Sequence, residues 1–368
     1  MAEPLKNMFN LGFIVPFSEV CNKHIPNFNK NHFINAVFDD NWENLELKPR
    51  IKHIAHSLHK QLTDSIPINL NYITAISEDI RINQNKQDTF MYLVLCDYIE
   101  VYGLEHLKES LIAIEKVTIL ASCEFAIRPF IIKDPEYVFK TLNNWSKNNH
   151  PSVRRLASEG CRPRLPWGMG IPFLKINPSL IFPVLENLKD DDSLFVRRSV
   201  ANNINDISKD HPSKILSLLK KWIGVSKERN WLVKHAARTL LKQGNSDALK
   251  LFGYGDVTNF ETTVIHLLKN KVCIGDYLCF TFSIKNKSNK AQKVRLEYFI
   301  YFLLAKGKLS KKIFKISERN LTANETLYYK RRHSFKIIST RKYYTGIHKV
   351  SLVINGVEKE TDNFQLNK

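Results

Sequence analysis

Two carboxylates, Glu124 and Glu159, stand among arginines near the middle of the chain, 35 residues apart. Carboxylates in such surroundings have two interpretations. They can form an ion-pair network that joins neighbouring elements of the fold. They can instead stabilise positive charge, or activate a water, in a reaction beside an anionic ligand. The spacing alone leaves both interpretations open.

One tryptophan close to these acids in sequence is placed for contact with a ligand. Trp167 follows Pro163 and Pro166, in a stretch without helical periodicity that ends near Pro172. An aromatic residue on such a loop is a candidate contact residue, although it could also cover the core. The following Gly168-Met169-Gly170 lacks the third glycine and the strand-turn-helix context of a dinucleotide-binding loop, which excludes that function.

Cationic residues recur in pairs along the same part of the chain. Similar segments begin at Val117, Val153, Val196 and Val233. The last three carry cations at the same two positions: Arg154 and Arg155, Arg197 and Arg198, and Lys234 and His235. Helices packed about 8–10 Å apart would align these cations into a stripe that can follow a phosphate backbone. The alternative is a solvent-exposed helix face.

The segments that carry these residues form a repeat. Their starting points are 36, 43 and 37 residues apart, and a proline able to begin a helix precedes each of the last three: Pro135, Pro178 and Pro212. Upstream, apolar residues between Ile51 and Leu62 recur at the spacing of one helix face. Two helices per unit and a period near 40 residues predict a HEAT-like α-solenoid.

The pattern changes at residues 253–256. Beyond them apolar and polar residues alternate in 278–284, 294–304 and 350–354, and Asn355-Gly356 is a strong hairpin-turn signal. These features predict a small antiparallel β-sandwich. We therefore expect a mainly α protein with two domains, a HEAT-like α-solenoid over residues 1–252 and a β-sandwich over residues 253–368.

The charge of the chain favours a polyanionic partner. Lys and Arg number 55 against 36 Asp and Glu, a net charge of +19, and residues 253–368 hold 22 and 9 of them, a net +13. Such an excess attracts nucleic acid first and an acidic membrane surface second. Over residues 310–344 the basic residues alternate with Phe314, Tyr328, Tyr329, Phe335, Tyr343 and Tyr344. This pattern is typical of nucleic-acid binding, and the alternative is a sandwich with basic outer faces.

Several other classes of function are disfavoured. None of the six cysteines forms a C-x-x-C pair, which argues against a zinc ribbon. His53, His56 and His59 are spaced by three residues, but no cysteine or carboxylate completes a ligand set, so we expect no metal and no cofactor. The longest apolar run, near 298–305, is about half a membrane span, and the N-terminus lacks the apolar segment of a secretory signal. We expect a soluble, reduced, cytoplasmic protein.

At these residues the chain resembles a known family, the AlkC type of DNA alkylation repair glycosylases. The stretches that carry the resemblance are AEPLKNMF, LELKPRIKHIAHSL, SCEFAIRPF, VRRLASEGCRPRLPW and VRRSVANNINDISKDHP. They span most of residues 1–245, and RLASEGCRPRLPW is a specific string. The β-sandwich resembles, in position and pattern, the immunoglobulin-like extension of one branch of this family.

The resemblance implies a bacterial enzyme that excises cationic N-alkylated bases, typified by 3-methyladenine and 3-methylcytosine, without flipping the base into a pocket. It implies catalytic roles for Glu124, Glu159 and Trp167, and an accessory DNA-binding role for the β-sandwich. The residues expected to bind DNA, from the resemblance and from the repeated cations together, are Arg128, Arg154, Arg155, Arg162, Arg164, Arg197, Arg198, Asn202, Lys234 and His235. Cys123 and Cys161 stand where small residues are expected, and either thiol could make the protein sensitive to oxidation.

The expected partner is double-stranded DNA that contains alkylated bases, bound by a nucleoid-associated monomer with no obligatory protein partner and no membrane. A second hypothesis is a HEAT-repeat scaffold that binds DNA or protein without catalysis. A membrane-surface binder is a third, and it lacks an amphipathic anchor. The two acids and Trp167 inside the basic stripe favour the enzyme, because a scaffold has no need of carboxylates beside phosphate.

Overall fold

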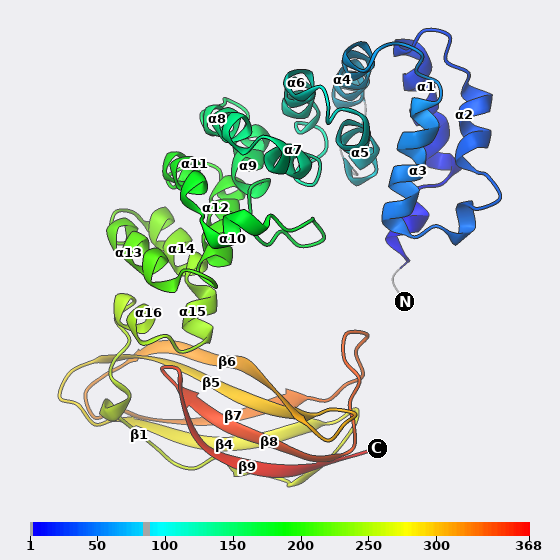
Figure 1. The fold of residues 1–368 in the computed structure, drawn as a ribbon. Helices are drawn as coiled ribbons and strands as arrows, with labels where there is room; N and C mark the ends of the chain where they lie inside the picture. Colours follow the sequence, from blue (N-terminus) through cyan, green and yellow to red (C-terminus); the bar gives the residue numbers. More distant parts are fainter. Residues whose placement is uncertain (1–2, 84–88) are drawn as a thin grey trace. The chain divides into compact units, whose positions relative to one another are not determined.

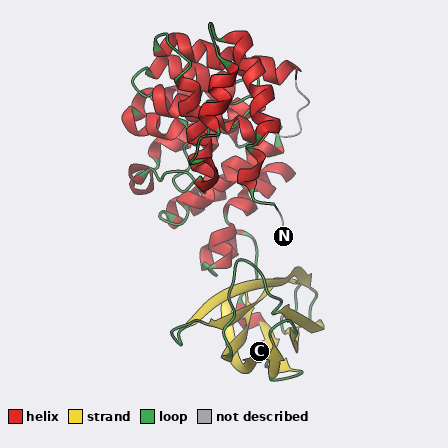
Figure 2. Ribbon diagram, turned by 90° about the vertical axis from the view of Figure 1, so that its right-hand side faces the viewer, coloured by secondary structure: helices red, strands yellow, loops and turns green. Residues whose placement is uncertain are grey.

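A computed structural model describes residues 3–83 and 89–368 of the chain. Residues 1–2 and 84–88 of the predicted solenoid therefore lie outside the described residues. The chain divides into two compact units, one formed by residues 1–211 and 222–236 and the other by residues 212–221 and 237–368. Helices make up the N-terminal part of the chain and strands its C-terminal part (Figure 2).

The first unit consists of helices that follow one another in chain order (Figure 1). They are α1 (Leu11–His24), α2 (Lys30–Val37), α3 (Leu47–His59), α4 (Ile66–Asn83), α5 (Leu93–Tyr102), α6 (Leu107–Val117), α7 (Ile127–Lys133), α8 (Pro135–Trp145), α9 (Pro151–Glu159), α10 (Pro172–Ile176), α11 (Phe182–Leu188), α12 (Leu194–Ile207) and α14 (Lys227–Ala236). Within the helix pairs, α8 packs on α9 and α11 on α12, and between pairs α9 packs on α12 and α12 on α14. This stacking confirms the predicted α-solenoid.

The start of each repeat follows from local chemistry. Pro135 is the first residue of α8, and the Asp134 carboxylate caps the helix by accepting the Tyr137 amide at 3.0 Å. Pro212 likewise begins α13 (Pro212–Trp222). Pro178 differs, because it precedes a short 3-10 turn, Ser179–Ile181, and α11 begins only at Phe182.

Tryptophans at equivalent repeat positions tie successive repeats together. The Trp145 indole donates to the Glu115 carboxylate at 2.8 Å, and the Trp222 indole donates to Glu186 at 3.1 Å. Both rings are buried, so each hydrogen bond satisfies a donor that would otherwise be unpaired in the core. These bonds join residues 30 and 36 positions apart, about one repeat.

The second unit holds α13, α15 (Arg238–Lys242), α16 (Ser246–Leu251) and two β-sheets. One sheet has the order β1-β4-β2 with β7 also paired to β4, and the other has the order β3-β9-β8-β5-β6. The strands are β1 (Phe260–Thr262), β2 (His266–Leu267), β3 (Lys271–Cys273), β4 (Tyr277–Asn286), β5 (Gln292–Leu303), β6 (Leu309–Leu321), β7 (Thr326–Ser334), β8 (Gly346–Ile354) and β9 (Val357–Asn367). The change from helix to strand falls between α16 and β1. The second compact unit begins earlier in the chain, because it also includes residues 212–221 and 237–252.

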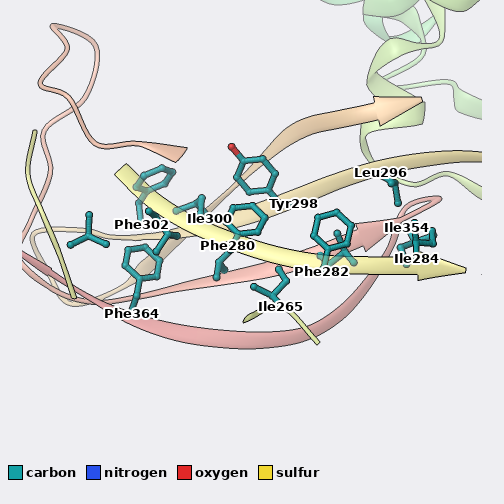
Figure 3. Close-up of a cluster of buried hydrophobic side chains, with 14 of the residues drawn as sticks. Ile265, Phe280, Phe282, Ile284, Leu296, Tyr298, Ile300, Phe302, Ile354 and Phe364 are labelled. Carbon is teal, nitrogen blue, oxygen red and sulfur yellow. The ribbon is translucent and has the colours of Figure 1, made fainter. Parts of the chain in front are cut away.

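The predicted alternation builds the core between the two sheets. The side chains that alternate inward include Phe280, Phe282, Ile300 and Phe302, and all are buried in one cluster (Figure 3). Asn355-Gly356 joins β8 to β9 with φ of +44° and +77°, the left-handed geometry of the predicted two-residue hairpin turn. The predicted alternating segments therefore correspond to β4, β5 and β8, and the predicted turn is confirmed. The sandwich is not wholly antiparallel as predicted, because β3 pairs with β9 in parallel.

Candidate active site

Glu124 lies in the turn that joins α6 to α7. The Cys123 amide donates to the Thr118 hydroxyl at 3.4 Å and helps to fix this turn. The Glu124 carboxylate accepts from the Ser122 hydroxyl at 2.8 Å and pairs with Arg155 at 2.7 Å. Its side chain is 17% exposed, so it keeps one route to solvent or ligand.

Glu159 is the last residue of α9 and is only 5% exposed. Its Oε1 lies 2.7 Å from Arg162 Nη1 and 3.8 Å from Arg155 Nη2. Arg155, one helical turn earlier, therefore contacts both predicted acids. The two glutamates therefore belong to one ion-pair network.

The network contains a third carboxylate that the sequence analysis missed. Arg162 Nε donates to Asp206 Oδ2 at 2.9 Å, and Asp206 lies on α12 with an exposed fraction of 2%. Burial of Arg162 opposes its charge, but Glu159 and Asp206 outweigh burial and raise the pKa of the guanidinium. The residue at the repeat position of Glu159 in the next unit is Asn202, so the repeat did not point to Asp206. No spacing in the sequence singled out Asp206, because only the packing of α12 buries it beside Arg162.

The loop that follows α9 presents Trp167 to solvent. The ring is 64% exposed, and its backbone has φ of +64°, a conformation that costs a non-glycine residue about 1–3 kcal/mol. The Trp167 carbonyl accepts a hydrogen bond from the Lys48 ammonium of α3. Gly168 is close to the Phe125 ring, since a Cβ on this glycine would lie 3.3 Å from it. The loop that carries Trp167 is therefore held beside the turn that carries Glu124.

Arg128 holds the same loop from inside, which corrects its predicted role. It is completely buried and donates to the carbonyls of Met169, Gly160 and Arg162 at 2.6, 2.8 and 2.9 Å. Burial lowers the pKa of the guanidinium to about 10. The guanidinium donors of Arg128 are used within the protein, where they shape the loop that carries Trp167. Arg162, 7% exposed and paired with two acids, is likewise corrected from phosphate binding to the acidic network.

The repeated cation pairs divide into two kinds. In the first two pairs, the first arginine contacts the turn between α11 and α12. Arg154 makes a bidentate contact with the Asp191 carboxylate at 2.5 and 3.1 Å, and Arg197 donates to the carbonyls of Asp191 and Asp192. These contacts use the guanidinium groups inside the protein, so the prediction that Arg154 and Arg197 bind phosphate is not supported. The two arginines repeat because each also donates to backbone carbonyls five and six residues before it, at the start of its helix.

The second residues of the three pairs differ in exposure: Arg198 is exposed, whereas Arg155 and His235 are half-buried. Arg155 packs its guanidinium over the Phe195 ring, 4.6 Å from the centroid, and Arg198 is exposed on α12. On α14 the His235 ring lies 3.3 Å from the Asn202 amide oxygen and stacks on Trp231, and Lys234 is half-buried. Arg164 is exposed and pairs with Asp210 at 2.6 Å. DNA binding by Arg155, Arg164, Arg198, Asn202, Lys234 and His235 stays a prediction.

The segment 310–344, in which basic and aromatic residues alternate, has some of its aromatic residues on the surface and others in the core. On β7, Tyr328 is 84% exposed, and Lys330 and Arg332 alternate with it on the same face. Phe335 in contrast is completely buried in the core. The exposed residues of β7 are therefore available for the predicted contact with nucleic acid, whereas Phe335 is not.

The histidines of α3 bond to separate partners. The His53 ring contacts the Ala36 carbonyl at 3.0 Å, His56 contacts the Tyr102 hydroxyl, and His59 contacts the Tyr98 hydroxyl at 3.1 Å. Among the residues that the structure describes, no three His, Cys, Asp or Glu side chains are grouped to hold a metal ion. In the same described part of the chain, no helix combines the length and apolar character needed to cross a membrane.

Comparison with known proteins gives consistent results for both parts of the chain. The family described as "Uncharacterised protein YhaZ, C-terminal Ig-like domain" matches residues 261–368. The chain is 41% identical over 362 residues to "Uncharacterized protein YhaZ" of Bacillus subtilis (strain 168), covering 98% of this chain and 99% of that protein. A solved structure, "Pseudomonas fluorescens alkylpurine DNA glycosylase AlkC bound to DNA containing an abasic site analog", is 31% identical with a TM-score of 0.93 and full coverage of both chains.

Proposed function

The chain belongs to the family of Bacillus subtilis YhaZ and Pseudomonas fluorescens AlkC, and from this premise we propose that it is a DNA glycosylase for alkylated bases. The substrates that we propose are cationic N-alkylated bases such as 3-methyladenine and 3-methylcytosine. The reaction is hydrolysis of the N-glycosidic bond, which leaves an abasic site in the DNA.

The observation that carries this proposal is the network of Glu124, Arg155 and Glu159 beside the loop of Trp167. Arg155 lies 2.7 Å from one acid and 3.8 Å from the other. A carboxylate held by an arginine keeps a fixed position, which is what electrostatic catalysis requires. The same arginine limits the negative charge that approaching DNA phosphates would meet.

The chemistry of a cationic base suits such a site. An N3-alkylated base already carries positive charge, so it leaves without a proton from the enzyme. Cleavage leaves a deoxyribose with oxocarbenium character. In the proposed mechanism Glu124, the more exposed acid, orients the attacking water, while Glu159 and Glu124 together stabilise the cationic sugar. The exposed Trp167 ring contacts the sugar or the cationic base by cation–π attraction.

We propose that the surrounding cations bind the DNA backbone. The exposed guanidinium groups of Arg164 and Arg198 are placed to contact phosphates, and the β unit supplies Tyr328, Lys330 and Arg332 as an accessory surface. Its net charge of +13 over residues 253–368 adds long-range attraction. We further expect a cytoplasmic, nucleoid-associated monomer that acts without flipping the base.

The test is incubation of the full-length protein with methylated DNA, followed by chromatography of the released bases. We expect release of 3-methyladenine and 3-methylcytosine, with full activity in EDTA. Complete loss in EDTA that zinc or magnesium restores would overturn the metal-free mechanism. Tight binding to methylated DNA without any base release would favour the non-catalytic scaffold instead.

A further inference from the structure

A cavity of about 670 Å³ lies in the first unit, next to the loop of Trp167. Its walls come from α3, α5 and the turns at Phe125 and Trp167, and Phe90 and Leu93 add apolar surface. Glu124 and Glu159 are not among the residues that line it. A largely apolar cavity of a few hundred cubic ångströms with a few polar groups is the usual form of a small-molecule site.

The polar side chains that line this cavity include two carboxyls, Asp97 and Glu100, beside the basic residues Lys48, Lys52, His53 and His56. The two carboxyls lie three residues apart on α5 and therefore share one helix face. Among the described residues, Asp97 Oδ2 is buried without any hydrogen-bond partner. A buried acceptor of this kind is costly unless a ligand or water supplies a donor.

The basic residues near Asp97 and Glu100 do not bring the pKa values of these two carboxyls back to their ordinary range. Burial raises the pKa of Asp97 to about 6, and burial together with the charge of Asp97 raises the pKa of Glu100 to about 7. Lys48 and Lys52 oppose these shifts without cancelling them. The other titratable groups that line the cavity are His53, His56 and Cys96.

The Lys48 ammonium already contacts other residues of the cavity wall, which makes it less available to an anionic ligand. Its ammonium donates to the Trp167 carbonyl and lies 5.2 Å from the centroid of the Phe125 ring. The cavity thus combines aromatic walls with carboxyls that can each donate or accept a proton near neutral pH. The complementary ligand is flat, apolar on its faces and rich in N–H groups along one edge.

We propose that this cavity binds an amino-bearing heteroaromatic base, the alkylated nucleobase after its release from DNA. The identity of the ligand rests on the proposed function. The amino group of 3-methyladenine and its adjacent unmethylated ring nitrogen match the paired donor and acceptor of a protonated carboxyl on Asp97 or Glu100. The base would leave the reaction site past Trp167, whose loop lines the cavity.

The experiment measures binding of free 3-methyladenine to the full-length protein by isothermal titration calorimetry, with no DNA present. We expect saturable binding that weakens roughly tenfold or more in Asp97→Leu and Glu100→Leu, because each variant loses the side-chain donor and acceptor that pair with the base, whereas an amide would still supply both. Glu109→Leu is the matched control, since Glu109 is an exposed acid on α6. 1-Methylbenzimidazole, which has a similar shape and no amino group, should bind at least tenfold more weakly than 3-methyladenine.

Two results would overturn the proposal. One is the absence of binding by the wild-type protein, or equal binding by wild type and both cavity variants whose folding is verified by circular dichroism. The other is a fall in the single-turnover excision rate of Asp97→Leu without any binding of the free base to the wild-type protein, which would place the base in the cavity while it is still attached to DNA. Because binding is measured without DNA, failure of the glycosylase activity and failure of the cavity site are distinguishable.

Discussion

Replacing each candidate catalytic acid by its amide separates catalysis from structure. Glu124→Gln and Glu159→Gln remove one negative charge and keep the size of the side chain. In the wild type, Glu124, Glu159 and Asp206 face Arg155 and Arg162, and Lys209 lies 3.2 Å from Asp206. These charges balance, so either substitution leaves the site with a net positive charge. DNA affinity should therefore stay the same or rise.

The structure predicts different effects of the two variants on rate and on stability. Loss of one preorganised electrostatic contact to the transition state commonly costs about 3–4 kcal/mol, or roughly 10²–10³ in rate. For stability, Glu159→Gln removes a partner of the buried Arg162, which retains Asp206, and should cost about 1–3 kcal/mol. Glu124 is 17% exposed, so its amide should cost about 1 kcal/mol or less.

The assay is single-turnover excision of 3-methyladenine with enzyme in excess, run beside thermal unfolding and fluorescence anisotropy on the same DNA. The matched control is Asp191→Asn, which breaks the buried contact with Arg154 outside the candidate site. This control should lose stability and keep its rate. Rates within about twofold of wild type in both glutamine variants, with only the unfolding temperature lowered, would refute the catalytic role. The acids would then serve only to hold the repeats together.

Three further outcomes follow from the same structure. Arg198→Ala should weaken binding to any DNA and reduce the slope of log affinity against log salt concentration by about one. Arg154→Ala is the control and should leave this slope unchanged. Equal slopes for Arg198→Ala and wild type would show that Arg198 does not contact DNA phosphates. Deletion of the chain from Asp256 onward should leave a helical protein, by circular dichroism, that binds and repairs DNA poorly at matched ionic strength; full activity of that protein would contradict the accessory role of the β unit. Because the folded-state pKa values of Asp97 and Glu100 are raised to about 6 and about 7, their contribution to stability is present below about pH 4 and is lost as the pH rises to about 7. Asp97→Asn should therefore raise the unfolding temperature at pH 8 and leave it nearly unchanged at pH 4, and an identical shift at both pH values would argue against a raised pKa.

The sequence by itself determined the elements and their order. The helix periodicity, the prolines at repeat starts, the strand alternation and the Asn355-Gly356 turn are local signals, because each depends on residues within about one helical turn or one hairpin. The repeat also placed Glu124 and Glu159 near each other, since residues one period apart in a solenoid occupy adjacent layers.

Only the tertiary structure decided which cations are available and which acids join them. Arg154 and Arg155 are adjacent in sequence, yet one folds onto Asp191 and the other reaches Glu124, because neighbouring helix positions point about 100° apart. Arg128 is buried by a loop more than 30 residues away, and Asp206 enters the network from α12 by packing rather than by repeat position. Burial and long-range partners arise from the packing of whole helices, so spacing within the sequence could not reveal them.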